Sequence, residues 1–229
     1  MNVTLLTHTP DVEKTIALAA KLCYSDSNIG ALEERLGNES QDKFIKKILD
    51  LGHLSVLEHA SFTFGIEGIS RATSHQLVRH RLASYSQQSQ RYVKMQEDAE
   101  FVVPPSVLAK PEIEKKFREA ARLSYKVYEE LTKAGVPKED ARYLLPNAAE
   151  TKIIMTMNAR ELLHFFELRC CERAQWEIRE MATIMVKLVK KVATSIFDDA
   201  GPGCVSGPCL EGDMTCGKPK EIRKKFREL

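Results

Sequence analysis

The sequence lacks the features that would mark a membrane or secreted protein. None of its apolar runs approaches the roughly 20 residues that a helix needs to cross a bilayer. Residues 1–10 contain no basic segment followed by an apolar stretch, which is the pattern of a secretory signal. Apolar residues make up 43% of the chain and charged residues 29%, as is typical of soluble globular proteins. We therefore expect a cytoplasmic protein.

Motifs for binding phosphate or metal through a local segment are also missing. The chain has neither a GxGxxG sequence after a strand nor a Walker-type loop. It has no cysteines two residues apart, the spacing usual in zinc sites; the six cysteines are at positions 23, 170, 171, 204, 209 and 216. We expect reduced thiols and no metal, with a metal-binding regulator built on Cys204, Cys209 and Cys216 as an alternative hypothesis.

One window stands out because it contains no acidic residue and no lysine. Between Ser70 and Arg91 the only charged residues are four arginines, accompanied by two histidines. The guanidinium group offers planar, bidentate donors to phosphate or carboxylate. A phosphate-binding protein without a glycine-rich loop must use side chains, and this window could supply them. Arg71, at its beginning, is expected on the surface.

Hydrophobic periodicity predicts an α+β fold. Helices are expected at 11–24, 41–51, 71–81, 112–134, 138–145, 159–171 and 175–196, and strands at 61–67 and 151–157. Residues 82–91 are expected to form a loop, and residues 92–103 extended segments. This mixed order favours a small antiparallel sheet flanked by long helices. We expect one catalytic domain over 1–200, then a Cys/Gly/Pro-rich and finally basic tail over 201–229.

Two of the helices carry specific expectations. The core stripe of helix 112–134 is expected to contain Ile113, Phe117, Ala120, Ser124, Val127 and Leu131. Helix 159–171 should begin with a capping box of Asn158 and Glu161 and be buried on most sides. Buried arginines need anionic partners, so Arg160 and Arg169 imply two anionic ligands, or one ligand and one carboxylate, with Glu167 as the alternative partner of Arg160. The basic stretch 218–227 is expected to be a solvated end.

Within the arginine window, helical spacing places Gln76, Arg79 and His80 on one face and Arg81 elsewhere. The following segment is rich in hydroxyl and amide groups and ends in Arg91. Such a window could bind a nucleotide, or it could belong to a nucleic-acid-binding module that uses residues 71–91. The net charge of +2 and the 7% aromatic content argue against the second hypothesis.

The string RHRLASYSQQSQRY, which contains Arg79-His80-Arg81, seven residues and then Ser89, resembles the signature of flavin-dependent thymidylate synthases. Gly52-His53-x-Ser55-x-x-Glu58-His59 is similar to the upstream segment of that family. Further similar segments are Ala141-Arg142 with Pro146, Asn158-Ala159-Arg160 through Arg169, and Ala174 to Ile178. The resemblance extends from about His53 to Ile178.

The resemblance implies an enzyme that methylates dUMP to dTMP. 5,10-methylenetetrahydrofolate would be the carbon donor, FAD the relay and NADPH the reductant, in a homotetramer with shared active sites. By resemblance, the dUMP-binding residues are Gln76, Leu77, Val78, Arg79, Gln87, Gln88, Ser89, Gln90, Arg91, Arg142 and Arg169. The FAD-binding residues are, likewise, His53, Ser55, Arg79, His80, Arg81, Gln87, Asn158, Ala159, Arg160 and His164.

Three positions receive specific roles. Arg169 is the family position thought to stabilise dUMP ionised at N3, and a permanent cation suits that catalytic role. Ser89 is expected to orient dUMP rather than to attack it, because no base obviously pairs with it in the sequence. At Gln87 many relatives carry Glu, so the charge at this ligand position is missing here.

Overall fold

The computed structural model describes residues 1–37, 40–95 and 100–229. These residues form two compact units. Unit 1 contains Met1–Asn2, Ile66–Arg79 and Tyr85–Ile154, and unit 2 contains Val3–Gly65, His80–Ser84 and Met155–Leu229. No helix within these ranges is long and apolar enough to span a membrane.

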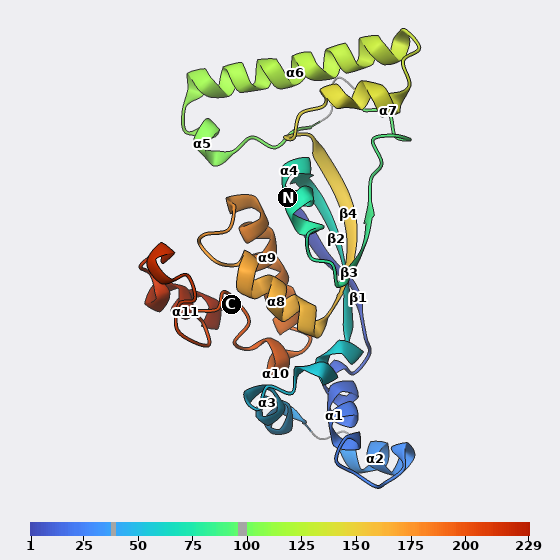
Figure 1. Cartoon of the computed structure of the whole chain (residues 1–229), viewed down its shortest axis with the longest axis vertical. Helices are drawn as coiled ribbons and strands as arrows, with labels where there is room; N and C mark the ends of the chain where they lie inside the picture. Colours follow the sequence, from blue (N-terminus) through green and yellow to red (C-terminus); the bar gives the residue numbers. More distant parts are fainter. Residues whose placement is uncertain (38–39, 96–99) are drawn as a thin grey trace. The chain divides into compact units, whose positions relative to one another are not determined.

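Four strands form the antiparallel sheet, as expected for the α+β class. They are β1 (Asn2–His8), β2 (Ser61–Ser70), β3 (Ala83–Gln87) and β4 (Glu150–Asn158), in the order β1-β2-β4-β3 (Figure 1). Alternate residues of β2, namely Phe62, Phe64 and Ile66, are buried as their period of two predicts. In β4 the same alternation buries Ile153, Met155 and Met157.

The arginine window does not fold as expected. Helix α4 (Arg71–Leu77) begins at Ser70, whose hydroxyl accepts the N–H of Thr73 at 3.1 Å, and it ends four residues before position 81. The segment expected to be a loop contains strand β3 instead. Tyr85 of β3 ties the strand to the end of α4, because its hydroxyl donates to the carbonyl of Leu77 at 2.9 Å. Arg79 and His80 therefore follow the helix and do not share a helical face with Gln76.

Besides α4, the described part of unit 1 contains three helices and a 3-10 turn, most of which pack around a small core. They are α5 (Pro105–Leu108), α6 (Pro111–Lys133), α7 (Lys138–Ala141) and the 3-10 turn η2 (Arg142–Leu144). Helix α6 packs against α7 and η2, as Figure 1 shows within this unit. The core contains Met95, Tyr125, Tyr128, Ala141 and Ala149. Of the segment expected to be extended, residues 96–99 lie outside the described ranges, and Phe101 forms an antiparallel bridge with Ala149.

The core stripe expected for α6 is only partly correct: Leu131 packs against the core, but none of the expected residues is fully buried. The buried residues are Ala121, Tyr125 and Tyr128, whereas Ile113 is 47% exposed. The tyrosines can be buried because their hydroxyls find partners: that of Tyr125 donates to the carbonyl of Glu100, and that of Tyr128 accepts the N–H of Met95, both at 3.4 Å. Apolar spacing alone therefore placed the centre of the buried face one residue too early.

Unit 2 holds most of the helices. Its N-terminal part forms α1 (Val12–Leu22), α2 (Ile29–Leu36), α3 (Asp42–Asp50) and the 3-10 helix η1 (Leu54–His59). Its C-terminal part forms α8 (Ala159–Arg169), α9 (Trp176–Lys190), α10 (Thr194–Phe197), the turn η3 (Gly212–Met214) and α11 (Pro219–Arg227). Helix α8 packs against η1 and α9, and α10 packs against α3 and α9. The helix expected over 175–196 is thus two helices.

Aromatic side chains join these helices to the sheet residues of unit 2. The ring of Phe197 lies edge-on to Phe62 at 5.4 Å and to Phe166 at 6.2 Å between centroids. All three side chains are fully buried. Pairs of this geometry contribute about 0.5–1.5 kcal/mol beyond the burial of their area. The cluster therefore anchors the short helix α10.

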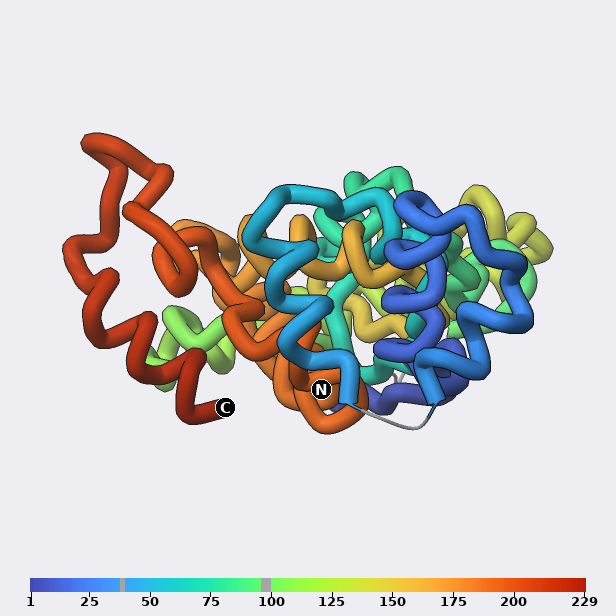
Figure 2. Tube along the Cα trace, turned by 90° about the horizontal axis from the view of Figure 1, so that it is seen from below, coloured from blue at the N-terminus to red at the C-terminus, as the bar shows by residue number. Residues whose placement is uncertain are grey.

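The basic C-terminal stretch is not simply a solvated end, contrary to expectation. It forms α11, drawn in red near the C-terminus in Figure 2, and it buries Ile222 and Phe226 at helical spacing. The carbonyl of Phe226 accepts a hydrogen bond from Lys190 Nζ at 2.6 Å. Arg223 donates to the carbonyls of Cys204, Val205 and Gly207. The helix therefore holds the preceding loop in place.

Candidate functional site

Two arginines of unit 1 contact one glutamate, and a third lies near one of them. Arg91 forms an ion pair with the carboxylate of Glu139, and the Nε–H of Arg142 donates to the main-chain carbonyl of the same residue at 3.2 Å. Arg71 is half-buried rather than on the surface. Burial, and then the positive charge of Arg142, lower the pKa of its guanidinium below the ordinary value. These three cations, connected through Glu139 and through the interaction of Arg71 with Arg142, form a site that favours an anion.

The amide and hydroxyl groups expected to contact dUMP begin at the end of β3. Gln87 donates from Nε2 to the hydroxyl of Thr151 at 3.2 Å, and the N–H of Gln88 donates to the carbonyl of Lys152 at 2.9 Å. The hydroxyl of Ser89 accepts the N–H of Arg91 at 3.2 Å. These bonds attach the segment to β4. The neutral amide of Gln87 already has a protein partner, which is consistent with an orienting role.

The dUMP and FAD sets predicted from the sequence divide largely between the two units. Unit 1 contains the predicted dUMP-binding residues at 76–79, 87–91 and 142, and unit 2 contains Arg169. Apart from Arg79 and Gln87, the predicted FAD-binding residues belong to unit 2. The Arg79-His80-Arg81 motif itself crosses the boundary, with Arg79 in unit 1 and the other two in unit 2.

In unit 2, His80 lies between a carboxylate and a guanidinium. Its Nδ1 is 3.2 Å from Oε1 of Glu161, and its Nε2 accepts the Nε–H of Arg169 at 3.0 Å. The side chains of His80 and Glu161 are only 4% and 7% exposed. Burial, and then the positive charge of Arg169, lower the pKa of His80 below its ordinary value, although Glu161 acts in the opposite direction. The imidazole is therefore neutral near pH 7.

Of the expected capping box, the cap by Asn158 is present, but the return bond from Glu161 is replaced by the contact with His80. Asn158 does cap α8, because its side chain accepts the N–H of Glu161 at 2.8 Å. The side chain of Glu161 was expected to return the bond to the main chain of Asn158, but it contacts His80 instead. Nothing in the local sequence distinguishes these two partners, since His80 is 81 residues away.

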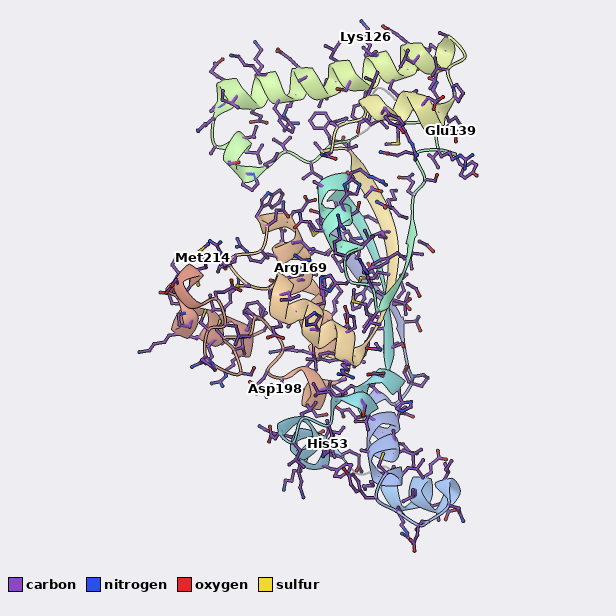
Figure 3. The ribbon with its side chains drawn as sticks, viewed as in Figure 1. His53, Lys126, Glu139, Arg169, Asp198 and Met214 are labelled. Carbon is purple, nitrogen blue, oxygen red and sulfur yellow. The ribbon has the colours of Figure 1, made fainter. Side chains whose placement is uncertain are left out.

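A cavity of about 1190 Å³ lies in the same unit. It is lined by Asn158, which caps α8, by Arg160 and His164 of α8, by Lys43 and Lys46 of α3, and by residues of the segment 194–210. Ligand cavities commonly have volumes of about 300–1000 Å³, so this space is sufficient for a large cofactor. Figure 3 labels Arg169 on α8 and Asp198, which follows α10 and also lines the cavity.

Arg160 is not buried, and its partner is not Glu167. The guanidinium Nη1 donates to Oε1 of Glu58 at 2.6 Å, and the two side chains are 50% and 48% exposed. The expectation failed because Arg160 lies on the one exposed stripe of α8, together with His164 and Leu168, although the rest of the helix is buried or partly buried as expected. Glu58 lies in η1, which packs against α8. Its place in the family-like segment at 52–59 was visible in the sequence, but the ion pair was not.

Of the remaining predicted FAD-binding residues of unit 2, Ala159 is fully buried and the other three lie at the surface. His53 and Ser55 are exposed at the start of η1, and Arg81 is exposed after His80. The ring of His53 has Nε2 3.5 Å from the hydroxyl of Tyr24. Exposed polar groups such as these are available to a ligand, whereas the ring of His80 is enclosed. Lys43 and Lys46 are cavity residues that sequence reasoning missed, because they lie outside every recognised motif.

The tail cysteines lie close to one another and to Cys171. The thiol of Cys171 donates to Oε1 of Glu211 at 3.8 Å. Burial raises the pKa of Cys171, and the carboxylate of Glu211 and the thiols of Cys216 and Cys209 raise it further. Among the described residues, no three His, Cys, Asp or Glu side chains are arranged to hold a metal ion.

Comparison with known proteins connects these observations. A family model described as "Thymidylate synthase complementing protein" matches residues 4–194. A protein of Geobacter sulfurreducens named flavin-dependent thymidylate synthase is 61% identical over 100% of this chain and 99% of its own length. A protein of the same name from Clostridium tetani is 47% identical over 98% of this chain and 96% of its own length. Another from Thermococcus onnurineus is 46% identical over 100% of this chain and 97% of its own length.

Proposed function

The chain belongs to the flavin-dependent thymidylate synthases, and from this premise we propose how its residues share the work. The arginine cluster of Arg71, Arg91 and Arg142 binds the phosphate of dUMP. The segments 76–79 and 87–91 bind the nucleoside. The cavity beside α8 binds FAD, and Arg169 acts on the uracil. NADPH is the reductant and 5,10-methylenetetrahydrofolate the carbon donor.

The observation that best supports this proposal is that Arg91 and Arg142 both contact Glu139, while Arg71 lies near Arg142. A nucleotide monophosphate is a dianion near neutral pH, and charge-assisted hydrogen bonds to it are worth about 1.5–3 kcal/mol each. Arg71 and Arg142 repel one another in the present arrangement. A bound phosphate offsets this repulsion between the two guanidinium groups, and this makes the free energy of phosphate binding more favourable.

The cavity fits a flavin in size and in the chemistry of its donors. Arg160, Lys43 and Lys46 are cations suited to a diphosphate, and Asn158 and His164 provide polar groups. The flavin, when bound, supplies the redox chemistry that side chains cannot perform. The fixed positive charge of Arg169 stabilises negative charge that develops on the uracil, because a guanidinium keeps its proton throughout. Ser89 orients the nucleotide.

The test combines flavin binding with product formation. We would load the purified protein with FAD, remove excess flavin, and add NADPH anaerobically with and without dUMP. Retained flavin that bleaches with NADPH, at a rate that dUMP changes, is the expected result. Addition of 5,10-methylenetetrahydrofolate should then yield dTMP. A protein that retains no flavin would contradict the proposal.

The phosphate site has its own test. Arg71→Gln and Arg142→Gln should each raise the Kd for dUMP about 10- to 150-fold, which corresponds to one lost charge-assisted hydrogen bond. Arg118→Gln is the matched control, because Arg118 lies on α6 and pairs with Glu114 of its own helix. An unchanged Kd for dUMP in the first two variants would refute this assignment of the cluster.

We propose further that the enzyme is a cytoplasmic homotetramer with active sites shared between subunits. Support comes from the family membership and from nothing in a single chain. Light scattering of the purified protein should give about four times the chain mass of 25.9 kDa. At a dUMP concentration too low for the Arg142→Gln variant, mixing this variant with Arg169→Leu should restore part of the activity if subunits share sites and exchange. A monomeric mass, or no recovery after proven exchange, would contradict this proposal.

A further inference from the structure

His80 is held in a way that fixes its protonation. A guanidinium Nε–H is only a donor, so Nε2 of His80 must accept from Arg169. An ionised carboxylate is only an acceptor, so Nδ1 must carry the hydrogen that is donated to Glu161. The neutral imidazole with its hydrogen on Nδ1 satisfies both contacts, whereas an imidazolium would direct a second N–H at the guanidinium.

Three groups that act on His80 lie on α8. They are Glu161, Arg169 and His164, whose ring centroid is 6.1 Å from that of His80. Phe165 packs edge-on against the imidazole with centroids 4.9 Å apart. The carboxylate and the aromatic ring therefore fix the position of the imidazole, and the imidazole in turn contacts the guanidinium of Arg169.

We propose that His80 is a positioning residue that, held by Glu161, orients the guanidinium of Arg169 toward the uracil of dUMP. The inference rests on the proposed role of Arg169. An arginine side chain has four rotatable bonds before its guanidinium, and a hydrogen bond at Nε fixes the plane of that group. Catalysis by a fixed charge depends on such preorganisation. The ring of His80 then acts on the reaction only through Arg169, and any flavin contact of this residue is made by its main chain.

The chain carries a corresponding pH sensitivity. Protonation of His80 would break the bond to Arg169 Nε and place two positive charges side by side. The acidic loss of kcat/KM for dUMP should therefore follow the titration of His80. Glu161 favours the protonated form, and Arg169 and His164 oppose it.

The experiment compares two substitutions in the FAD-loaded enzyme. His80→Phe keeps an aromatic ring and removes both hydrogen bonds, while His80→Gln keeps one donor and one acceptor but does not titrate. We expect His80→Phe to lower kcat at least tenfold with the Kd for FAD unchanged within twofold. His80→Gln should recover most of kcat and lose the acidic limb of the pH profile. His75→Gln, at an exposed position of α4, is the matched histidine control.

A double-mutant cycle with Arg169→Lys tests the positioning role of His80 separately from the catalytic role of Arg169. If His80 acts through Arg169, His80→Phe should have little further effect on kcat in the Arg169→Lys background. Additive effects would overturn the inference, as would a Kd for FAD raised tenfold with kcat unchanged. If Arg169→Lys and Arg169→Leu both keep the wild-type kcat, the role of Arg169 itself is wrong. Should His80→Phe not fold, retention of the acidic limb in His80→Gln would still refute the inference.

Discussion

The ion pair between Arg160 and Glu58 implies competition for one guanidinium. If Arg160 binds the flavin, as we propose, its bond to Glu58 must open or be shared when the cofactor enters. Glu58→Gln removes the negative charge and keeps the shape of the side chain. We therefore expect this substitution to strengthen FAD binding, the opposite of what removal of a cofactor ligand would do.

The magnitude follows from the exposure of the pair. Both side chains are about half exposed, and ion pairs of this kind contribute about 0.2–1 kcal/mol. The Kd for FAD should then fall about 1.4- to 5-fold. Quenching of flavin fluorescence in a titration at low ionic strength measures the change. At 1 M salt, where the Debye length is about 3 Å, the difference between variant and wild type should shrink.

A control excludes a general effect of net charge. Glu33→Gln removes one negative charge from α2, where Glu33 faces Lys14 at 3.8 Å and does not line the cavity. Its Kd for FAD should match that of the wild type. If Glu58→Gln weakens FAD binding instead, Glu58 holds the cofactor or positions Arg160 for it, and the competition described above does not exist.

Three further predictions concern stability and reactivity. Phe197→Ala should lower the free energy of unfolding by about 3–5 kcal/mol, measured by urea denaturation, because it removes the centre of a buried aromatic cluster; Phe197→Leu should cost about half as much, and equal losses would refute this account. Burial raises the pKa of Tyr125 to about 12. The unfolded chain releases this proton near pH 10, so stability is lost as pH rises from about 10 to 12, by up to roughly 3 kcal/mol, and Tyr125→Phe should remove that slope. Burial also raises the pKa of the Cys170 thiol, so a disulfide reagent should modify exposed Cys23 in the native protein and Cys170 only after unfolding; rapid native labelling of Cys170 would contradict this.

The sequence predicted those elements whose periodicity is long and clear. Strands β2 and β4 alternate between buried and exposed residues over most of their length, so their positions and their buried faces could be read directly. In α6 the apolar positions and the buried positions differ, because tyrosine can be fully buried once its hydroxyl has a partner. Those partners, Glu100 and Met95, are distant in sequence, and no local sequence pattern predicts them.

The candidate site was likewise predictable in part. Its residue types could be named from the arginine window and the family-like motifs, but its contacts could not. Polarity alone suggested a loop at 82–91, yet five of these residues alternate in a strand. Glu161 was placed correctly at the start of α8, while its buried contact with His80 depends on the tertiary fold. Ion pairs such as that of Arg160 with Glu58 connect residues 102 positions apart.

The wall of the cavity formed by residues 198–210 has a consequence for selective inhibition. The family model matches residues 4–194, so this wall lies beyond the part of the chain that it describes. Arg223 of α11 donates hydrogen bonds to the carbonyls of Cys204, Val205 and Gly207, and so stabilises this wall. A compound that extended from the cavity toward Pro208 and Leu210 would contact a surface that need not be common to the family. Such a compound could distinguish this enzyme from relatives that share its motifs but differ in this wall.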